Sequence, residues 1–260
     1  ANLETRVLPA EDFIQIFMES LRKLQTHDFV AKQQSKFLTA KKEKLRQGEF
    51  LVIADFSVNY SAVIQDEIQS YHWCSTQTTI HPFMCYYKGD DGHVGHTCFV
   101  VISECTDHDT AAVHLFQQKL IDFLTARWKI RPQKIVYFSD GCAAQYKNCK
   151  NFINLCHHMD DFNVEAEWHF FATSHGKTAG GGAAETLKRS ATRSSLQRPY
   201  AEQIITPRQL FYYACCTIKG MNFDFATLQE HRDEDRLLNS RFAAAKTILG
   251  TQKLHIFQPL

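Results

Sequence analysis

The chain has 260 residues, of which 44% are hydrophobic and 22% are charged, and its formal net charge at pH 7 is +1. These values are typical of a soluble globular protein, and the net charge alone does not indicate a nucleic-acid partner. No apolar run approaches the roughly 20 residues that a membrane-spanning helix needs, and no signal peptide opens the chain, so we expect no membrane partner. Nine cysteines at irregular spacings favour reduced thiols in an intracellular protein over a disulfide framework.

The chain is predicted to begin with helices. Residues 10–25 carry apolar side chains at helical spacing, and a second helix over about 28–46 ends at Gly48. A hydrophobic strand over Phe50–Phe56 follows, and a polar, partly helical connection runs from Asn59 to Tyr71.

A hairpin and an amphipathic helix come next. The strands Thr78–Tyr87 and Thr97–Ser103 are joined by the turn-forming sequence Gly-Asp-Asp-Gly at 89–92. The pattern then predicts a helix over Thr110–Trp128 and a strand over Ile135–Phe138.

The remaining predicted elements alternate between helix and strand. A helix over Ala143–His158 precedes a strand over Glu165–Ala172. A glycine-rich segment then leads into a helix over about 182–196, and a further helix covers Arg208–Cys216.

The order of these elements predicts the fold class. The early hairpins imply antiparallel pairing, and the later alternation of strand and helix implies parallel crossovers. This order resembles the ribonuclease H-like fold, in which three antiparallel strands and two parallel additions form a mixed five-stranded sheet flanked by helices. We therefore predict an α/β chain with a helical N-terminal flank (1–48), a ribonuclease H-like catalytic core (49–200) and a helical C-terminal flank (201–260).

Two aspartates stand at the ends of hydrophobic strands. Asp55 ends the run Phe-Leu-Val-Ile-Ala-Asp, and Asp140 ends the run Lys-Ile-Val-Tyr-Phe-Ser-Asp. Strands this apolar are buried on both faces of a sheet, so each carboxylate emerges at the sheet rim, where open α/β sheets hold their ligands. Two neighbouring carboxylates repel each other unless a divalent cation lies between them. We therefore expect Mg²⁺ or Mn²⁺ in a two-metal site for phosphoryl transfer.

Such a site needs a third carboxylate, which we expect on the last helix of the core. Between Glu167 and Glu202 the sequence offers one acid, Glu185, which is therefore selected by elimination as the third catalytic and metal-binding residue. The alternative is an ordinary helix glutamate that pairs with Lys188 or Arg189 one turn later. Glu167, in the middle of a strand, is expected to face outward from the sheet.

Basic residues surround Glu185 in the sequence, which favours contacts with a phosphate backbone. Lys188 and Arg189 are the candidates on the helix itself. His175 and Lys177, beside the glycine-rich turn, could line the scissile phosphate, because backbone N–H groups at a helix start form an anion site. A plain structural turn is the alternative for that segment.

Four motifs support a resemblance to a known group of proteins. They are Asp-Phe-Ser-Val-Asn-Tyr at 55–60, Phe-Ser-Asp-Gly-Cys-Ala-Ala-Gln-Tyr-Lys-Asn at 138–148, Glu-Trp-His-Phe-Phe-Ala-Thr-Ser-His-Gly-Lys at 167–177 and Ser-Leu-Gln-Arg-Pro-Tyr at 195–200. The chain resembles transposon-derived proteins of animal genomes over about residues 10–216. The resemblance implies a ribonuclease H-like transposase core of the DDE/DDD type, DNA as the partner and a nuclear location.

The sequence departs from this group at one position. After His175-Gly176-Lys177 the group continues with Cys-Asp-Gly and, later, a Lys-Arg pair. This chain keeps Lys188-Arg189 but has Gly180-Gly181-Gly182, so Gly181 stands where the resemblance implies the third acid. Glu185 lies one helical turn after Gly181, and its longer side chain points back toward the helix N-terminus, so it could supply the missing oxygen.

The leading hypothesis is a metal-dependent polynucleotidyl transferase or nuclease of transposase origin that cleaves or joins DNA phosphodiesters. One alternative is a domesticated, catalytically inactive domain that binds DNA or a protein partner. Another is an exonuclease of the same fold that digests single strands. The sequence contains no recognisable DNA-reading module, and a homo-oligomer is compatible with each hypothesis.

Overall fold

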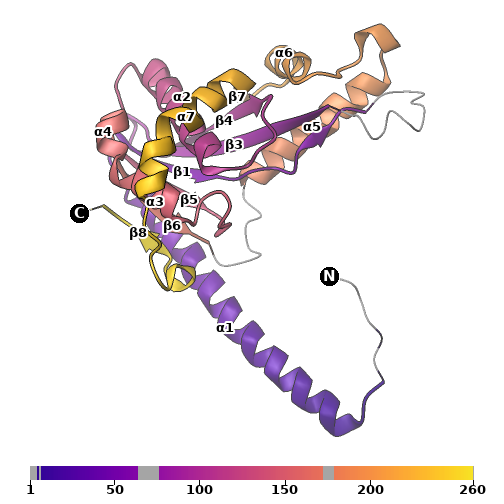
Figure 1. Ribbon diagram of the computed structural model, residues 1–260, viewed down its shortest axis with the longest axis vertical. Helices are drawn as coiled ribbons and strands as arrows, with labels where there is room; N and C mark the ends of the chain where they lie inside the picture. The colour runs from indigo at the N-terminus through magenta and orange to yellow at the C-terminus, as the bar shows by residue number, and fades with distance from the viewer. Residues whose placement is uncertain (1–4, 6, 64–75, 172–178, 260) are drawn as a thin grey trace.

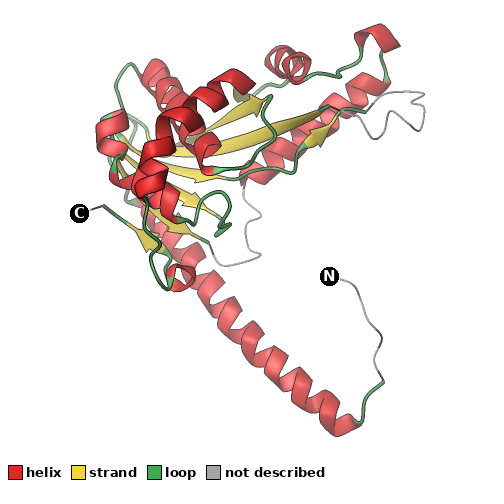
Figure 2. Ribbon diagram, viewed as in Figure 1, coloured by secondary structure: helices red, strands yellow, loops and turns green. Residues whose placement is uncertain are grey.

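The computed structural model describes residues 5, 7–63, 76–171 and 179–259 of the chain. In this part of the chain, eight strands form one mixed sheet with helices on both of its faces (Figures 1 and 2). The predicted α/β class is therefore confirmed. None of the helices in these ranges combines the length and the apolarity that a membrane span requires.

The centre of the sheet consists of the five predicted strands. β1 (Glu49–Ala54) lies between β3 (Gln77–Lys88), to which it is antiparallel, and β5 (Lys134–Ser139), to which it is parallel. β4 (Val94–Ser103) continues the sheet beyond β3, and β6 (Glu165–Phe170) continues it beyond β5. The order β4-β3-β1-β5-β6 and the directions of these strands agree with the prediction.

The sheet also extends beyond the predicted strands. β7 (Met221–Ala226) pairs in parallel with β4, and β8 (Ile256–Phe257) pairs antiparallel with β6. β2 (Tyr60–Ser61) pairs with β3. The segment predicted as a helical C-terminal flank therefore also supplies two edge strands. Edge strands are short and only partly covered, so their hydrophobic signal in the sequence is weak.

Helices cover the two faces of the sheet in separate layers. One face packs against α2 (Thr110–Trp128), α3 (Cys149–Cys156), α4 (His158–Phe162) and, over α2, α7 (Leu228–Ala244). The other face packs against α5 (Ala179–Leu196), α6 (Pro207–Thr217) and the last turns of α1 (Ala10–Glu43).

Strand β1 shows how the core is divided between these layers. Val52 and Ala54 contribute to the core beneath α2, whereas Leu51 and Ile53 contribute to the core beneath α5. All four side chains are buried, so this strand is covered on both faces, as its continuous hydrophobic sequence predicts.

Two predicted helix boundaries are wrong. The separate helices over 10–25 and 28–46 are one continuous helix, α1, because no proline or glycine interrupts the pattern between them. The helix predicted from Ala143 begins only at Cys149, because the side chain of Asn148 accepts a hydrogen bond from the backbone N–H of Asn151 (2.9 Å) and caps the helix there.

Glu167 anchors α1 to the sheet. Its carboxylate, on β6, accepts hydrogen bonds from His169 Nε2 (2.9 Å), Lys134 Nζ (2.8 Å) and Lys41 Nζ (2.5 Å), the last from the end of α1. The hydrogen bond from His169 and those from the two lysines hold the pKa of Glu167 well below its usual range. The prediction that Glu167 faces outward is wrong, because α1 covers this position and leaves the side chain 5% exposed.

We expect Glu167→Gln to destabilise the protein by about 3 kcal/mol at neutral pH, because two lysines would lose their buried counter-charge. Glu165→Gln, on the same strand but exposed, is the matched control. Urea unfolding measures both free energies. Since the pKa of Glu167 is lowered from 4.5 on folding, the ionised carboxylate stabilises the protein above pH 4.5 and this stabilisation is lost as the pH falls further. The difference in free energy of unfolding between the parent and Glu167→Gln should therefore be smaller at acid pH than at neutral pH. An equal loss of stability at neutral and at acid pH would contradict the role of the ionised Glu167.

Candidate functional site

The two predicted aspartates leave the sheet side by side. In the parallel pairing of β1 with β5, Ile53 lies opposite Phe138. Asp55 and Asp140 each follow two residues later, immediately after their strands end. Both side chains are half-buried. The structure therefore brings together the two carboxylates that the sequence singles out.

The electrostatics of the pair confirm that the carboxylates interact. Burial and, second, the negative charge of Asp140 raise the pKa of Asp55 from 3.8 to about 7. A carboxyl with this pKa is protonated half of the time at neutral pH, or it is ionised with a cation as its neighbour. Among the described residues, no cation offsets the burial and the repulsion that raise the pKa of Asp55.

The floor beneath the pair is neutral. The hydroxyl of Tyr146 is buried next to the pair. Burial and the negative charges of Asp55 and Asp140 raise its pKa well above 10. Tyr146 Oη lies 2.7 Å from Nε2 of His81, on β3, and burial lowers the pKa of that histidine to about 3. The neutral histidine and phenol can hold hydrogen bonds here without competing with a metal ion for the carboxylates. Neither residue is a site prediction from the sequence, although Tyr146 belongs to the 138–148 motif.

Asn59 fixes the loop that follows Asp55. Its Oδ1 accepts a hydrogen bond from Thr79 Oγ1 (2.9 Å) and lies 2.6 Å from His108 Nε2, while its Nδ2 donates to the carbonyl of Thr106 (3.2 Å). The ring of Phe56 stacks on His108 with centroids 4.4 Å apart. The strand end that carries Asp55 is therefore tied to β3 and to the loop before α2. Asp140 is held by its own turn, because its Oδ1 accepts the backbone N–H of Cys142 (3.1 Å).

Helix α5 forms one wall of this region through Lys188. The Nζ of Lys188 donates to the carbonyl of Val58 (2.6 Å), and burial lowers its pKa. Arg189, the next residue, is exposed. Glu185 is also exposed, and its charge acts on Lys188. The charge of Glu185 thus acts on the base one turn later, while the ammonium group of that base is bonded to the loop after Asp55.

The structure does not bring Glu185 together with the aspartates as a ligand set. Within the described ranges, no three His, Cys, Asp or Glu side chains are grouped so that they could hold a metal ion. Gly180–Gly182 lie inside the first turn of α5 rather than before it. Among the described residues, a Cβ added to Gly181 would have no neighbour within 4 Å outside its own helix backbone, so a side chain has space there. The predicted phosphate-binding residues His175 and Lys177 lie outside the described residues.

The donors that are present suit a hard cation. Asp55 and Asp140 offer carboxylate oxygens, which Mg²⁺ and Mn²⁺ prefer. Mg²⁺ commonly takes one or two carboxylates and completes its coordination with waters and substrate phosphates, so a pair can be sufficient. A divalent charge would favour the ionised form of Asp55, against the burial and the repulsion from Asp140 that raise its pKa.

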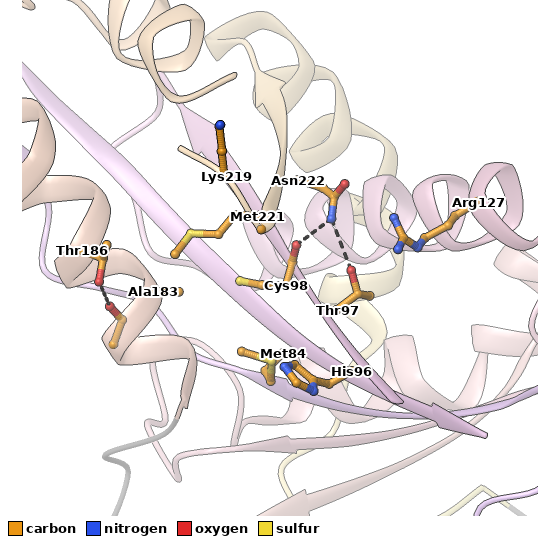
Figure 3. Close-up of a pocket in the computed structure, with 12 residues that line it drawn as sticks. Met84, His96, Thr97, Cys98, Arg127, Ala183, Thr186, Lys219, Met221 and Asn222 are labelled. Atoms are coloured by element: carbon orange, nitrogen blue, oxygen red, sulfur yellow. Dashed lines mark hydrogen bonds between the residues drawn. The ribbon is translucent and has the colours of Figure 1, made fainter. Parts of the chain in front are cut away.

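A separate cavity of about 480 Å³ opens between the start of α5 and the strands β4 and β7 (Figure 3). Gly182, Ala183 and Thr186 of α5 line one side of it. Its twelve lining residues include three basic side chains, His96, Arg127 and Lys219, and no carboxylate. The cavity therefore has the charge of an anion site, whereas the aspartate pair has the charge of a cation site.

A sequence model of a protein family matches residues 34–260, which includes the whole sheet, both aspartates and α5. The family is described as "Domain of unknown function (DUF8701)". The chain belongs to this family. No curated protein and no solved structure matches the chain. Any activity of the DUF8701 domain must therefore be argued from the site itself.

We expect Asp55→Asn to raise the melting temperature, by an amount that grows between about pH 4 and pH 7. The pKa of Asp55 is raised from 3.8 to about 7 on folding. Ionisation of Asp55 therefore does not reduce the free energy of unfolding below pH 3.8, and it reduces that free energy progressively as the pH rises through 7. Asparagine has no such ionisation. Calorimetric or fluorescence melting at acid and neutral pH measures the difference, with the exposed Asp235→Asn as the control.

Excess Mg²⁺ at neutral pH should remove the advantage of the asparagine variant, because the cation stabilises only the protein with both carboxylates. A melting-temperature difference that is independent of pH would contradict the raised pKa of Asp55.

Proposed function

We propose that this chain is a metal-dependent polynucleotidyl transferase or nuclease core of a DNA transposase or transposase-derived protein. The observation that carries the proposal is the Asp55–Asp140 pair at the ends of adjacent parallel strands. The central strand order β4-β3-β1-β5-β6 supports it, because that is the order of a ribonuclease H-like sheet. Fold class alone does not imply activity, so the proposal rests on the carboxylates.

The aspartates and the residues around them have different roles in this proposal. Asp55 and Asp140 would hold Mg²⁺ or Mn²⁺, which when bound activates a nucleophile and stabilises the leaving oxygen of a phosphodiester. The network around Asn59 keeps Asp55 in place, and the turn at Cys142 keeps Asp140 in place. Tyr146 excludes water from the floor of the site without introducing a charge that would compete with the cation.

The proposed substrate is DNA, contacted through its phosphate backbone. Lys188 of α5 contacts the loop that follows Asp55, the next residue, Arg189, is exposed, and the basic cavity lies at the start of the same helix. Together they offer positive charge along α5, which would neutralise backbone phosphates without reading bases. The proposed nuclear location rests only on the resemblance to transposon-derived proteins.

A catalytically inactive DNA-binding or protein-binding domain is the second candidate. The observation that favours it is the exposed position of Glu185, together with the glycine at position 181. In this case the two aspartates are the remainder of a three-carboxylate site, and the basic side chains of α5 retain the binding role.

Calorimetric titration with Mg²⁺ and Mn²⁺ separates the two candidates. We expect the parent chain to bind at least one ion and Asp140→Asn to bind it much more weakly, because the ion would lose one of the two carboxylates and its charge. If Glu185 is the third ligand, Glu185→Gln should weaken binding by about tenfold or more. If instead the parent binds nothing and Gly181→Asp gains an ion, the site is incomplete and the inactive candidate holds.

A strand-transfer assay on the metal-binding form tests the reaction itself. Joining of a DNA 3′ end to a target supports the transferase, cleavage alone supports a nuclease, and progressive digestion from single-stranded ends supports the exonuclease. In each case Asp140→Asn should abolish the products. Products that persist in this variant would refute the proposed site.

We expect Arg189→Glu to weaken DNA binding and to lower the slope of log affinity against log salt by about 1, because one phosphate contact is lost. Fluorescence anisotropy of a labelled duplex at several salt concentrations measures both quantities. Arg232→Glu, an exposed position on α7 across the sheet, makes the same charge change away from the site and serves as the control. Equal effects of the two variants would show that only net charge matters.

A further inference from the structure

The cavity beside the start of α5 has a floor of three sulfur-containing side chains. Met84 on β3 lies opposite Cys98 on β4, and Cys98 lies opposite Met221 on β7. Residues that lie opposite each other on neighbouring strands point to the same face of a sheet, so these side chains form one row across three strands. All three line the cavity (Figure 3) and are called the sulfur floor below. Burial raises the pKa of the Cys98 thiol to about 11, so the sulfur floor is uncharged at neutral pH.

The edge of the cavity is basic. His96 precedes Cys98 by two residues on β4 and therefore lies on the same face of the sheet as the sulfur floor. Arg127, from the last turn of α2, and Lys219, just before β7, are exposed side chains that also line the cavity. These three residues form the basic rim. A cleft lined by charges of one sign attracts the opposite sign, so the rim attracts an anion and repels a metal ion that the sulfur atoms would otherwise suit.

The walls of the cavity are set by the fold. Asn222 Nδ2 donates to Thr97 Oγ1 (3.2 Å) and to the carbonyl of Cys98 (3.0 Å), which fixes the start of β7 on β4. On the opposite wall, Gly182 of α5 carries no side chain into the cavity. Among the described residues, a Cβ added to Gly182 would have no neighbour within 4 Å outside its own helix backbone. The glycine therefore leaves this side of the cavity open to a ligand.

The size and the two-part lining of the cavity indicate the ligand. Its volume of about 480 Å³ is that of a small-molecule pocket and leaves room for much more than a single phosphate group. Thioether and thiol sulfur atoms pack favourably against aromatic rings, and arginine binds phosphate oxygens in a bidentate manner. A ligand with only an aromatic ring would leave the cations without a counter-charge, whereas a lone phosphate would leave the sulfur floor uncovered. A nucleoside phosphate satisfies both parts.

We propose that this cavity binds a nucleotide, with its phosphate at the basic rim and its base on the sulfur floor. Two sources supply this chemical group, namely a free nucleoside monophosphate and a nucleotide unit of a single DNA strand. The proposal goes beyond a general attraction for backbone phosphates, because the base is bound as well. It does not depend on the proposed catalytic function, since neither Asp55 nor Asp140 lines the cavity.

Calorimetric titration of the full 260-residue chain with deoxyadenosine monophosphate, in a buffer with EDTA, tests the proposal. We expect a dissociation constant of about 10 µM to 1 mM, and binding at least about tenfold weaker for inorganic phosphate and for deoxyadenosine, because each supplies half of the contacts. A short single strand of deoxyadenosine nucleotides distinguishes the sources. Tighter binding of the strand identifies DNA as the source, and tighter binding of the monophosphate identifies the free nucleotide.

Three results would overturn the nucleotide proposal. One is the absence of binding by both the monophosphate and the strand. Inorganic phosphate that binds as tightly as the monophosphate would show that the sulfur floor holds no base. Deoxyadenosine that binds as tightly would show that the basic rim holds no phosphate.

Gly182→Glu tests the location of the ligand. The new carboxylate would repel the phosphate, so binding of the monophosphate should weaken by about tenfold or more. Glutamate favours a helix over glycine and suits the first turns of α5, so circular dichroism and melting should show a folded protein. Gln197→Glu, at an exposed position just after α5, makes the same change in net charge and should leave binding unchanged. Binding that survives Gly182→Glu would overturn the assignment to this cavity.

Two further variants separate the basic rim from the aspartate pair. Arg127→Gln should weaken binding by about tenfold, because a charged hydrogen bond to the phosphate is lost. Arg232→Gln, at an exposed position of α7, should leave it unchanged. Asp140→Asn should bind the monophosphate as tightly as the parent chain does. If Asp140→Asn abolishes this binding while Arg127→Gln keeps it, the ligand lies at the aspartates and the cavity proposal is wrong.

Discussion

The parallel pairing of β1 with β5 is the constraint on which the candidate site depends. It ends both strands at the same rim of the sheet and forces Asp55 and Asp140 to leave the core side by side. Burial, together with the smaller repulsion from Asp140, raises the pKa of Asp55 to about 7. Ionisation of Asp55 is therefore less favourable in the folded than in the unfolded protein. A bound divalent cation would favour the ionised form and so stabilise the folded protein.

The surrounding structure keeps the pair rigid and its floor neutral. Asn59 ties the loop after β1 to two other segments, while Tyr146 and His81 form an uncharged hydrogen-bonded floor. A protein cation in their place would pair with the carboxylates and remove the site's attraction for a metal. On the α5 side, Lys188 contacts the loop after Asp55, whereas Glu185 is exposed to solvent.

Helix α1 belongs to two environments. Its last turns are held on the sheet by the ion cluster at Glu167, whereas its first half presents exposed apolar side chains to solvent. The ion cluster therefore joins only the end of the helix to the sheet.

The sequence by itself determined the five central strands, helix α2 to the residue and the position of both aspartates, because hydrophobic periodicity is a local signal and strand ends place carboxylates at a sheet rim. Tertiary structure alone decided the rest. The edge strands β7 and β8 form by pairing with β4 and β6, which are distant in sequence. Glu167 is buried because the end of α1 packs over it. The exposure of Glu185 follows from how α5 is rotated against the sheet, which depends on side chains distant in sequence.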